Sequence, residues 1–304
     1  MKVLFVASYN KGYYAPFIVE QAEALRRKGT TVELFGVVGK GIKGYVKTLP
    51  RLKMAIKSFN PDIIHAHYGL CGLLANLQCK IPVVTTYHGS DINERKILHL
   101  SRISMALSGW NIFVSQPTLD IARPHNHYSL IPCGIDLSEL QLTKKADARN
   151  QMGLDAKKRY VLFAGSFDNT VKNASLAIDA ISHIPEAELL ELKGYTREQV
   201  TLLMCAADVF LMTSHTEGSP QVIKEAMACG CPIVSVNVGD VKWVTEGING
   251  CYIVERDAIS IAKQIEDMGS HTRTEGRRRI LELGLVNDVV AEKLLHIYKA
   301  LGNG

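Results

Sequence analysis

Two glutamates with eight-residue spacing flank the start of a predicted helix. Glu217 lies in the loop after a strand predicted at 209–212, and Glu225 lies about one and a half turns into a helix predicted near 220–229. Backbone N–H groups from Ser219 to Val222 lack partners within such a helix, so they form a site for an anion such as a diphosphate. A carboxylate accepts hydrogen bonds from two adjacent hydroxyl groups, as a ribose requires. The spacing therefore indicates a nucleotide-diphosphate site.

Pro220 fits the first turn of this helix, because the N–H that proline lacks would have no helical partner there. Gly218 and Gln221 belong to the same predicted anion-binding segment. A single glutamate on a helix is usually a solvated surface residue. That alternative stays open for Glu217 and Glu225 when each is considered alone.

Three histidines lie at the ends of predicted strands. His65 and His67 end a strand predicted at 63–66, so their side chains share one face. Such a pair could bind a metal, but no third ligand lies nearby in the sequence, and we expect a structural role and no metal site. His88 follows a strand predicted at 83–87, where parallel sheets bind their ligands. A buried core histidine is the alternative for His88.

Short apolar runs alternate with longer amphipathic stretches along the chain. This alternation is typical of parallel β-sheets that are covered by helices on both faces. Six strands are predicted in the first half, at 3–7, 32–37, 63–66, 83–87, 112–114 and 129–131. Five are predicted in the second half, at 160–164, 189–192, 209–212, 233–235 and 251–254. The clearest helices are expected at 15–28, 173–183, 196–206, 220–229 and 257–268.

We therefore predict two doubly wound, Rossmann-like α/β domains. The apolar periodicity fades in the polar stretch 143–150, so the first domain is expected at 1–150 and the second at 151–286. Ligands of such sheets bind at the carboxyl ends of the strands, and we expect a cleft between the two domains there.

The segment around both glutamates, SHTEGSPQVIKEAMACGCPIV at 214–234, resembles the E-x7-E block of retaining glycosyltransferases of family 4, which have the GT-B fold. The segments HAHYG, YHGSD and IPCGID resemble further motifs of that family and occur in the same order. The resemblance implies that Glu217 contacts the donor sugar and that Glu225 binds the nucleotide ribose. It also implies that His88 lies near the reacting end of the sugar, with Asp91 as its orienting partner.

The segment FAGSFDNTVKN at 163–173 is similar to the family's G-R-L-x4-K-G segment. This similarity makes Lys172 the phosphate-binding lysine and places Gly165 in the donor site. Ser166 stands where the family has an arginine, so one of two positive charges on the diphosphate is missing. Gly12 occupies the place of the family's glycine loop, beside the donor phosphates. The resemblance further implies that a last helix, 287–304, packs on the first domain.

A nicotinamide-binding alternative rests on three glycines. Gly39, Gly41 and Gly44 match the pattern G-x-G-x-x-G, and Asp62 follows near the spacing of a ribose-binding residue. That pattern belongs at the first βα turn, whereas these glycines follow the second predicted strand. We therefore expect no nicotinamide cofactor.

The first half of the chain is basic, because residues 1–150 carry 19 Lys and Arg against 10 Asp and Glu. From Lys40 to Lys57, basic side chains alternate with apolar ones. This pattern predicts docking on an anionic membrane surface or a phosphorylated acceptor, and a solvated helix face is the alternative. We expect no nucleic acid partner.

The seven cysteines include no CxxC pair, and their odd number suits small buried thiols in a reducing compartment. The first apolar run lacks a signal-peptide cleavage pattern, and no stretch reaches about 18 uncharged apolar residues. The sequence therefore predicts a cytoplasmic protein that is at most peripheral on the inner face of the membrane.

The resemblance implies a hexosyltransferase that moves a sugar from a nucleotide-diphosphate sugar to a glycan, lipid-linked or small-molecule acceptor, with retention of configuration. It implies a role in cell-surface polysaccharide or glycolipid synthesis, and it implies neither a cofactor nor a metal. Lys172 and the helix N-terminus near Ser219 would stabilise the leaving diphosphate. A GT-B nucleotide-sugar epimerase and a nucleotide-sugar-binding protein without turnover are the alternatives.

Overall fold

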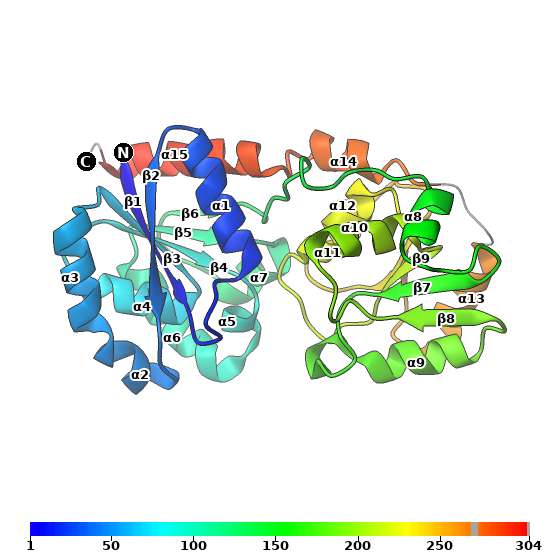
Figure 1. Ribbon diagram of the computed structural model, residues 1–304. Coiled ribbons are helices and arrows are strands. Elements are labelled where there is room, and N and C mark those ends of the chain that lie inside the picture. The colour runs from blue at the N-terminus through cyan, green and yellow to red at the C-terminus, as the bar shows by residue number, and fades with distance from the viewer. Residues whose placement is uncertain (269–272, 303–304) are drawn as a thin grey trace. The chain divides into compact units, whose positions relative to one another are not determined.

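The computed structural model describes residues 1–268 and 273–302 (Figure 1). The chain forms two compact units. Unit 1 comprises Met1–Gly134 and Leu285–Gly304, and unit 2 comprises Ile135–Gly284. The boundary expected at 150–151 therefore lies inside unit 2, and the boundary expected at 286–287 lies inside unit 1.

A helix that the sequence pattern did not reveal explains the first difference. Helix α8 (Lys145–Gln151) lies in the polar stretch expected to link the domains, yet it packs on α10 (Arg197–Ala206) of unit 2. Its buried Arg149 contacts the carboxylate of Asp208 at 2.7 Å. Because ion pairs hold much of this helix in place, apolar periodicity did not indicate it.

A six-stranded parallel sheet forms the centre of unit 1, with the order β2-β1-β3-β4-β5-β6. Its strands are β1 (Lys2–Ser8), β2 (Thr31–Val37), β3 (Ile63–His67), β4 (Val83–Tyr87), β5 (Trp110–Phe113) and β6 (Tyr128–Leu130). All six strands predicted for the first half of the chain are confirmed. The helices of unit 1 are α1 (Pro16–Arg27), α2 (Gly41–Lys47), α3 (Leu49–Phe59), α4 (Gly69–Asn76), α5 (Ser90–Asn93), α6 (Arg95–Leu107), α7 (Gln116–Ala122) and α15 (Asn287–Gly302).

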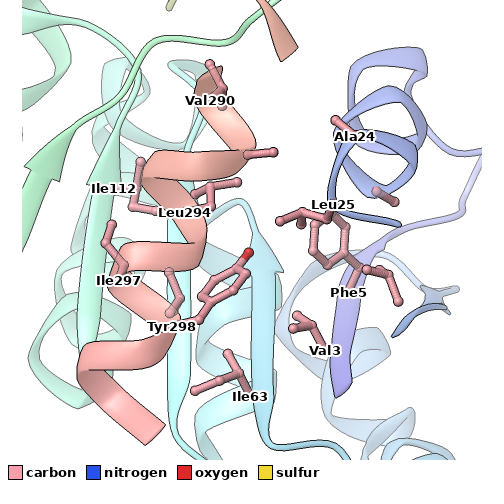
Figure 2. Close-up of a cluster of buried hydrophobic side chains, with 14 of the residues drawn as sticks. Val3, Phe5, Ala24, Leu25, Ile63, Ile112, Val290, Leu294, Ile297 and Tyr298 are labelled. Atoms are coloured by element: carbon pink, nitrogen blue, oxygen red, sulfur yellow. The ribbon is translucent and has the colours of Figure 1, made fainter. Parts of the chain in front are cut away.

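The side chains of β1 alternate between the two faces of this sheet. Val3 and Phe5 pack in a cluster with residues of α1 and α15, whereas Leu4 and Val6 pack in a cluster with residues of α3 and α4. Figure 2 shows the first cluster, in which side chains of α1 and α15 meet those of the strands. The last helix thus packs on unit 1 as expected; residues 303–304 of the expected range 287–304 lie outside the described residues.

Unit 2 is built around a five-stranded parallel sheet with the order β11-β10-β9-β7-β8. Its strands are β7 (Arg159–Phe163), β8 (Ala187–Leu190), β9 (Val209–Met212), β10 (Ile233–Val236) and β11 (Cys251–Val254). The five predicted strands are again confirmed. Besides α8 and α10, the helices are α9 (Ala174–Ser182), α11 (Gln221–Ala228), α12 (Val241–Thr245), α13 (Ala258–Asp267) and α14 (Gly276–Glu282), with a 3-10 turn at Thr170–Lys172.

The strand orders locate two places for ligands. In unit 1 the chain passes from β1 to β2 on one side and returns to β3 on the other, and in unit 2 β8 and β9 flank β7 in the same way. Parallel sheets of this kind bind ligands outside the carboxyl ends of the strands where the winding direction changes. The loops that follow β1, β7 and β9 therefore lie where each sheet can bind a ligand.

None of the helices that the structure describes is both long enough and apolar enough to span a bilayer.

We expect Leu294→Ala in α15 to lower the free energy of unfolding of unit 1 by about 2–5 kcal/mol, because the change empties a fully packed position. Leu294 is 1% exposed in the cluster of Figure 2. Urea denaturation measures the loss, with Lys299→Ala on the exposed side of the same helix as the control. A loss below about 0.5 kcal/mol, the usual size of a surface effect, would contradict this packing.

Candidate functional site

The predicted site residues divide between the two units. Glu217, Glu225 and Lys172 lie in unit 2 with Gly165, Ser166 and the segment 218–222. Gly12, His88 and Asp91 lie in unit 1.

The side chains of Lys172 and Glu217 meet in the loops after β7 and β9, where the winding direction of the unit 2 sheet changes. Their side chains form an ion pair with an Nζ–Oε1 distance of 2.7 Å, although 45 residues separate them in the chain. Thr213 donates to the backbone carbonyls of Lys172 and Asn173, each at 2.9 Å, and the His215 N–H donates to the Val171 carbonyl at 2.9 Å. The loops after β7 and β9 are therefore joined by backbone contacts as well as by the ion pair.

Gly165 and Ser166 shape the turn that leads to Lys172. A Cβ atom at Gly165 would lie 2.8 Å from the Cγ atom of Lys172, so only glycine lets the lysine side chain pass. The Ser166 hydroxyl donates to Asp168 at 2.7 Å, and Asp168 forms an exposed ion pair with Lys193 at 2.7 Å. Ser166 thus stabilises a local turn, and the position carries no positive charge.

Helix α11 begins at Gln221, shortly after Glu217 in the chain. Pro220 is the N-cap residue, one position earlier than expected, and Gln221 and Val222 form the start of the helix. The first N–H groups of a helix have no partner within the helix, and the helix dipole favours an anion beside them. The start of α11 thus falls within the segment 218–222, whose role as a diphosphate site stays a prediction.

Glu225 is buried on α11, with 6% of its surface exposed. Arg197, at the start of α10, contacts its carboxylate at 3.1 Å and also donates to Glu139 at 2.7 Å. Burial raises the pKa of Glu225, and Arg197 opposes that rise. Sequence reasoning missed Arg197, because one arginine after a helix cap carries no signal of a partner 28 residues away.

In unit 1, His88 lies among aromatic rings and other imidazoles. Its Nε2 is 3.1 Å from Nδ1 of His67, and its Nδ1 is 3.8 Å from the sulfur of Cys133. The rings of Phe17 and Tyr68 each lie with centroids 4.7 Å from that of His88. Burial lowers the pKa of His88 to about 3, so the ring is neutral at physiological pH and can exchange hydrogen bonds without carrying charge.

Asp91 orients the peptide backbone around His88. Its carboxylate accepts from the N–H groups of Gly69, His88 and Gly89, each at 3.0 Å. Burial raises the pKa of Asp91 to about 6, although these three hydrogen bonds act in the opposite direction. These contacts hold the main chain of the turn at His88, and the predicted role of Asp91 as orienting partner stays a prediction.

His65 and His67 are buried as structural residues. Both ring nitrogens of His65 have partners, Tyr298 at 2.5 Å and Thr86 at 2.7 Å. The His65 and His67 rings stack with centroids 4.5 Å apart. Within 1–268 and 273–302, no group of three or more His, Cys, Asp or Glu side chains could hold a metal ion.

A cavity of about 520 Å³ lies at the change of winding in unit 1. The loop after β1 contributes Asn10, Lys11 and Tyr13 to its wall, and Tyr45 and Tyr68 face it from α2 and from the end of β3. Gly12 is not part of the wall: its φ of +78° explains why glycine is present. The three tyrosines were missed by sequence reasoning because they come from separate segments.

The glycines of the nicotinamide alternative have a packing explanation. A Cβ atom at Gly39 would lie 2.7 Å from the backbone of Gly44, and the Asn10 side chain makes two hydrogen bonds to the Gly39 backbone at 2.7 and 2.9 Å. These glycines therefore allow close contact between α2 and the loop after β1.

The basic stretch from Lys40 to Lys57 forms α2 and α3 with the residues that lead into them. All six of its Lys and Arg side chains are exposed, and so are Ile42, Val46 and Met54, at 47%, 44% and 64%. Leu52 and Phe59 attach α3 to the core. The outer side of these helices therefore combines positive charge with apolar side chains.

Comparison with known proteins identifies two family models in the chain. The model described as Glycosyltransferase Family 4 matches residues 19–139, and the model described as Glycosyl transferases group 1 matches residues 186–271.

The curated relatives include TuaC of Bacillus subtilis, which is named for teichuronic acid biosynthesis. It is 27% identical over 242 residues, covering 70% of this chain and 62% of TuaC. The amylovoran biosynthesis glycosyltransferase AmsK of Erwinia amylovora is 26% identical, covering 77% of this chain and 68% of AmsK. This chain spans less than two thirds of the length of TuaC and 66% of that of a D-inositol 3-phosphate glycosyltransferase from Xylanimonas cellulosilytica.

Solved structures of GT-B glycosyltransferases share the fold. Sucrose-phosphate synthase of Thermosynechococcus elongatus superposes with a TM-score of 0.88 at 18% identity, covering 99% of both chains. HepE of Anabaena in complex with UDP-glucose superposes with a TM-score of 0.77 at 16% identity, covering 99% of this chain and 100% of HepE. The predicted class of two Rossmann-like α/β domains in the GT-B fold is confirmed.

The buried histidines predict how stability depends on pH. Burial lowers the pKa of His65 and of His88 to about 3, below the value of about 6.5 in an unfolded chain. From pH 6.5 downward the unfolded chain therefore binds more protons at these residues, and their contribution to stability is lost as the pH falls toward 3. Each can lower the free energy of unfolding by up to about 1.4 kcal/mol per pH unit.

We expect the free energy of unfolding, measured by urea denaturation between pH 7 and pH 5, to fall less steeply with decreasing pH in His65→Gln than in the original chain. The reason is that His65→Gln lacks one buried imidazole. Asp91 acts in the opposite sense, since burial raises its pKa, but it is present in both proteins. Equal slopes would contradict the neutral state of His65.

Proposed function

We propose that this chain, which matches glycosyltransferase family models at residues 19–139 and 186–271, transfers a sugar from a nucleotide-diphosphate sugar to an acceptor, with retention of configuration. The observation that carries the proposal is the meeting of Lys172 and Glu217 beside the start of α11. A cation, a carboxylate and a helix N-terminus then lie where a diphosphate joined to a sugar can contact all three.

In this proposal unit 2 binds the donor. Gly218, Ser219 and the first residues of α11 hold the diphosphate through backbone N–H groups, and Gly165 and Ser166 form the opposite turn. Glu225 accepts hydrogen bonds from the ribose hydroxyls. Burial raises the pKa of Glu225, and the nearby Arg197 guanidinium opposes that rise and so favours the ionised carboxylate that this role requires.

Catalysis then depends on charge placed at the leaving group. Lys172 leaves its ion pair with Glu217 and contacts the diphosphate, which releases the Glu217 carboxylate to the sugar hydroxyls. The positive ammonium and the helix N-terminus stabilise the negative charge that develops as the glycosidic bond breaks. The proposal assigns this task to the chain itself, with no metal or cofactor.

In this proposal unit 1 binds the acceptor, and His88 of this unit is a catalytic residue. The wall of tyrosines in its cavity presents aromatic faces and hydroxyl groups, which suit the apolar and polar sides of a sugar ring, and Lys11 adds a positive charge. These features support a glycan or a lipid-linked, phosphate-bearing acceptor. The names of TuaC and AmsK support a role in polysaccharide synthesis, and the HepE complexes support UDP as the donor nucleotide.

Ser166 favours a second candidate, a nucleotide-sugar-binding protein without turnover. The missing charge at this position weakens stabilisation of the leaving group, although it leaves the backbone site of α11 in place. Incubation with the donor and a lipid-linked or glycan acceptor separates the two, because only the transferase produces a new glycoside. An epimerised donor would point to the related epimerase reaction.

The donor assignment predicts that one nucleoside diphosphate among UDP, GDP and ADP raises the melting temperature. At a hundredfold excess over its dissociation constant such a ligand adds about 2.7 kcal/mol to the stability of the folded chain. Glu225→Gln should weaken its binding by about 1.5–3 kcal/mol in calorimetry, because a charge-assisted hydrogen bond to the ribose becomes a neutral one.

Glu198→Gln is the matched control, since Glu198 is exposed on the neighbouring helix α10. Unchanged affinity in Glu225→Gln would remove the ribose role. Protection by NAD but by none of the three diphosphates would overturn the donor proposal.

We further propose that the protein is cytoplasmic and docks peripherally on an anionic membrane surface through the basic stretch 40–57. The triple change Lys43→Glu, Lys47→Glu and Lys53→Glu should abolish binding to vesicles that contain anionic lipid, since each positive charge near such a surface contributes about 1 kcal/mol. Binding of the original chain should fall steeply with salt. Sedimentation with anionic and neutral vesicles measures both effects.

Lys144→Glu, Lys157→Glu and Lys158→Glu in unit 2 form the control, because these exposed lysines lie outside the basic stretch. Equal vesicle binding by both triple variants would contradict docking through 40–57. No vesicle binding by any form, with an acceptor Michaelis constant that rises only in the first variant, would indicate a soluble phosphorylated acceptor instead.

A further inference from the structure

Lys224 is fully buried on α11, directly before Glu225, with 0% of its surface exposed. Lysine is almost never buried completely unless it has a partner of opposite charge. Burying an ammonium also costs several kcal/mol of desolvation. Contacts of Lys224 with groups of opposite charge must offset this cost.

The ammonium of Lys224 contacts the side chains of Ser219 and Asp240. Its Nζ donates to the Ser219 hydroxyl at 2.5 Å and lies 3.4 Å from the Asp240 carboxylate. The Ser219 hydroxyl in turn donates to Asp240 at 2.6 Å. Ser219 and Asp240 are also buried, at 9% and 6% exposed. The three groups form a closed triangle beneath the segment that precedes α11.

The backbone beside Asp240 approaches the same segment closely. Gly239 has a φ of +54°, and a Cβ atom there would lie 2.5 Å from the carbonyl oxygen of Gly218 and 3.3 Å from the Cβ atom of Glu217. The loop after β10 therefore packs directly on the loop that carries Glu217. Asp240, the next residue, precedes α12 and reaches the buried triangle.

We propose that Lys224 and Asp240 are positioning residues for the diphosphate-binding segment, an inference that rests on the donor function proposed above. Together they fix the Ser219 side chain and hold the Gly218–Ser219 backbone against Gly239. The N–H groups at the start of α11 and the Glu217 carboxylate are thereby held in place before the donor arrives. Preorganised donors of this kind cost no rearrangement when charge develops.

The triangle also defines how Ser219 takes part. Its hydroxyl hydrogen points to Asp240, and its oxygen accepts from Lys224. The hydroxyl therefore serves the fold of the loop, and Ser219 meets the diphosphate through its backbone N–H.

The test compares binding of a nucleoside diphosphate with binding of its nucleoside. Lys224→Met alone would leave the Asp240 charge buried without its partner and could unfold the loop. We therefore use the double variant Lys224→Met with Asp240→Asn, which removes both charges at nearly equal volume. The probe is the diphosphate among UDP, GDP and ADP that protects the original chain, and the control variant is Lys242→Met at an exposed site on α12.

We expect the double variant to bind the diphosphate about tenfold more weakly or worse, while the nucleoside dissociation constant changes less than about twofold. Lys242→Met should change neither. Equal losses for diphosphate and nucleoside would show a general structural role, and no loss for either would show that the triangle is irrelevant to binding. Both results would overturn the inference.

Ser219→Ala provides a second measurement that keeps both charges. If the triangle acts as one unit, Ser219→Ala should also weaken diphosphate binding selectively, and combining it with the double variant should cause no further loss. Additive losses would overturn the inference. If the original chain binds none of the three diphosphates, the proposed function fails and this inference fails with it. If the original chain binds one of them but the losses of affinity in Ser219→Ala and in the double variant add, only this inference is rejected.

Discussion

The ion pair between Lys172 and Glu217 is the contact on which the account of unit 2 depends. It joins loops that leave neighbouring strands, β7 and β9, at the carboxyl edge of a parallel sheet. Strand order alone brings these loops together, because the chain winds in opposite directions on the two sides of β7. Thr213 then fixes the Lys172 backbone, so the pair has a defined place beside α11.

Two further ion pairs involve side chains of helix α11. Lys224 and Asp240 form a buried pair that also contacts Ser219, whereas the pair of Glu225 with Arg197 is buried only on the Glu225 side. Buried pairs add little net stability after desolvation, but removing one partner is costly. Such pairs therefore fix the positions of the paired side chains and add little to the free energy of unfolding. Unit 1 differs, since its candidate residue His88 is held neutral among aromatic rings and imidazoles.

Much of this arrangement was predictable, because apolar runs and turn residues are local signals. All eleven strands were expected within two residues of their observed ends, and the start of α11 was displaced by one. Helix α8 escaped because Arg149 and Asp208 hold it by charge, and α14 was not expected at all. The partners Arg197, Lys224 and Asp240 were also missed. Pairing between distant charged residues leaves no periodic trace in one sequence, so only the fold reveals it.

Hydrogen exchange of backbone amides can show whether unit 2 binds the donor at the start of α11. With a saturating nucleoside diphosphate, we expect slower exchange concentrated at residues 218–222 and in the turn at 165–172. Bound N–H groups exchange more slowly because they must open first. Slowing confined to unit 1, or spread evenly over both units, would contradict the account.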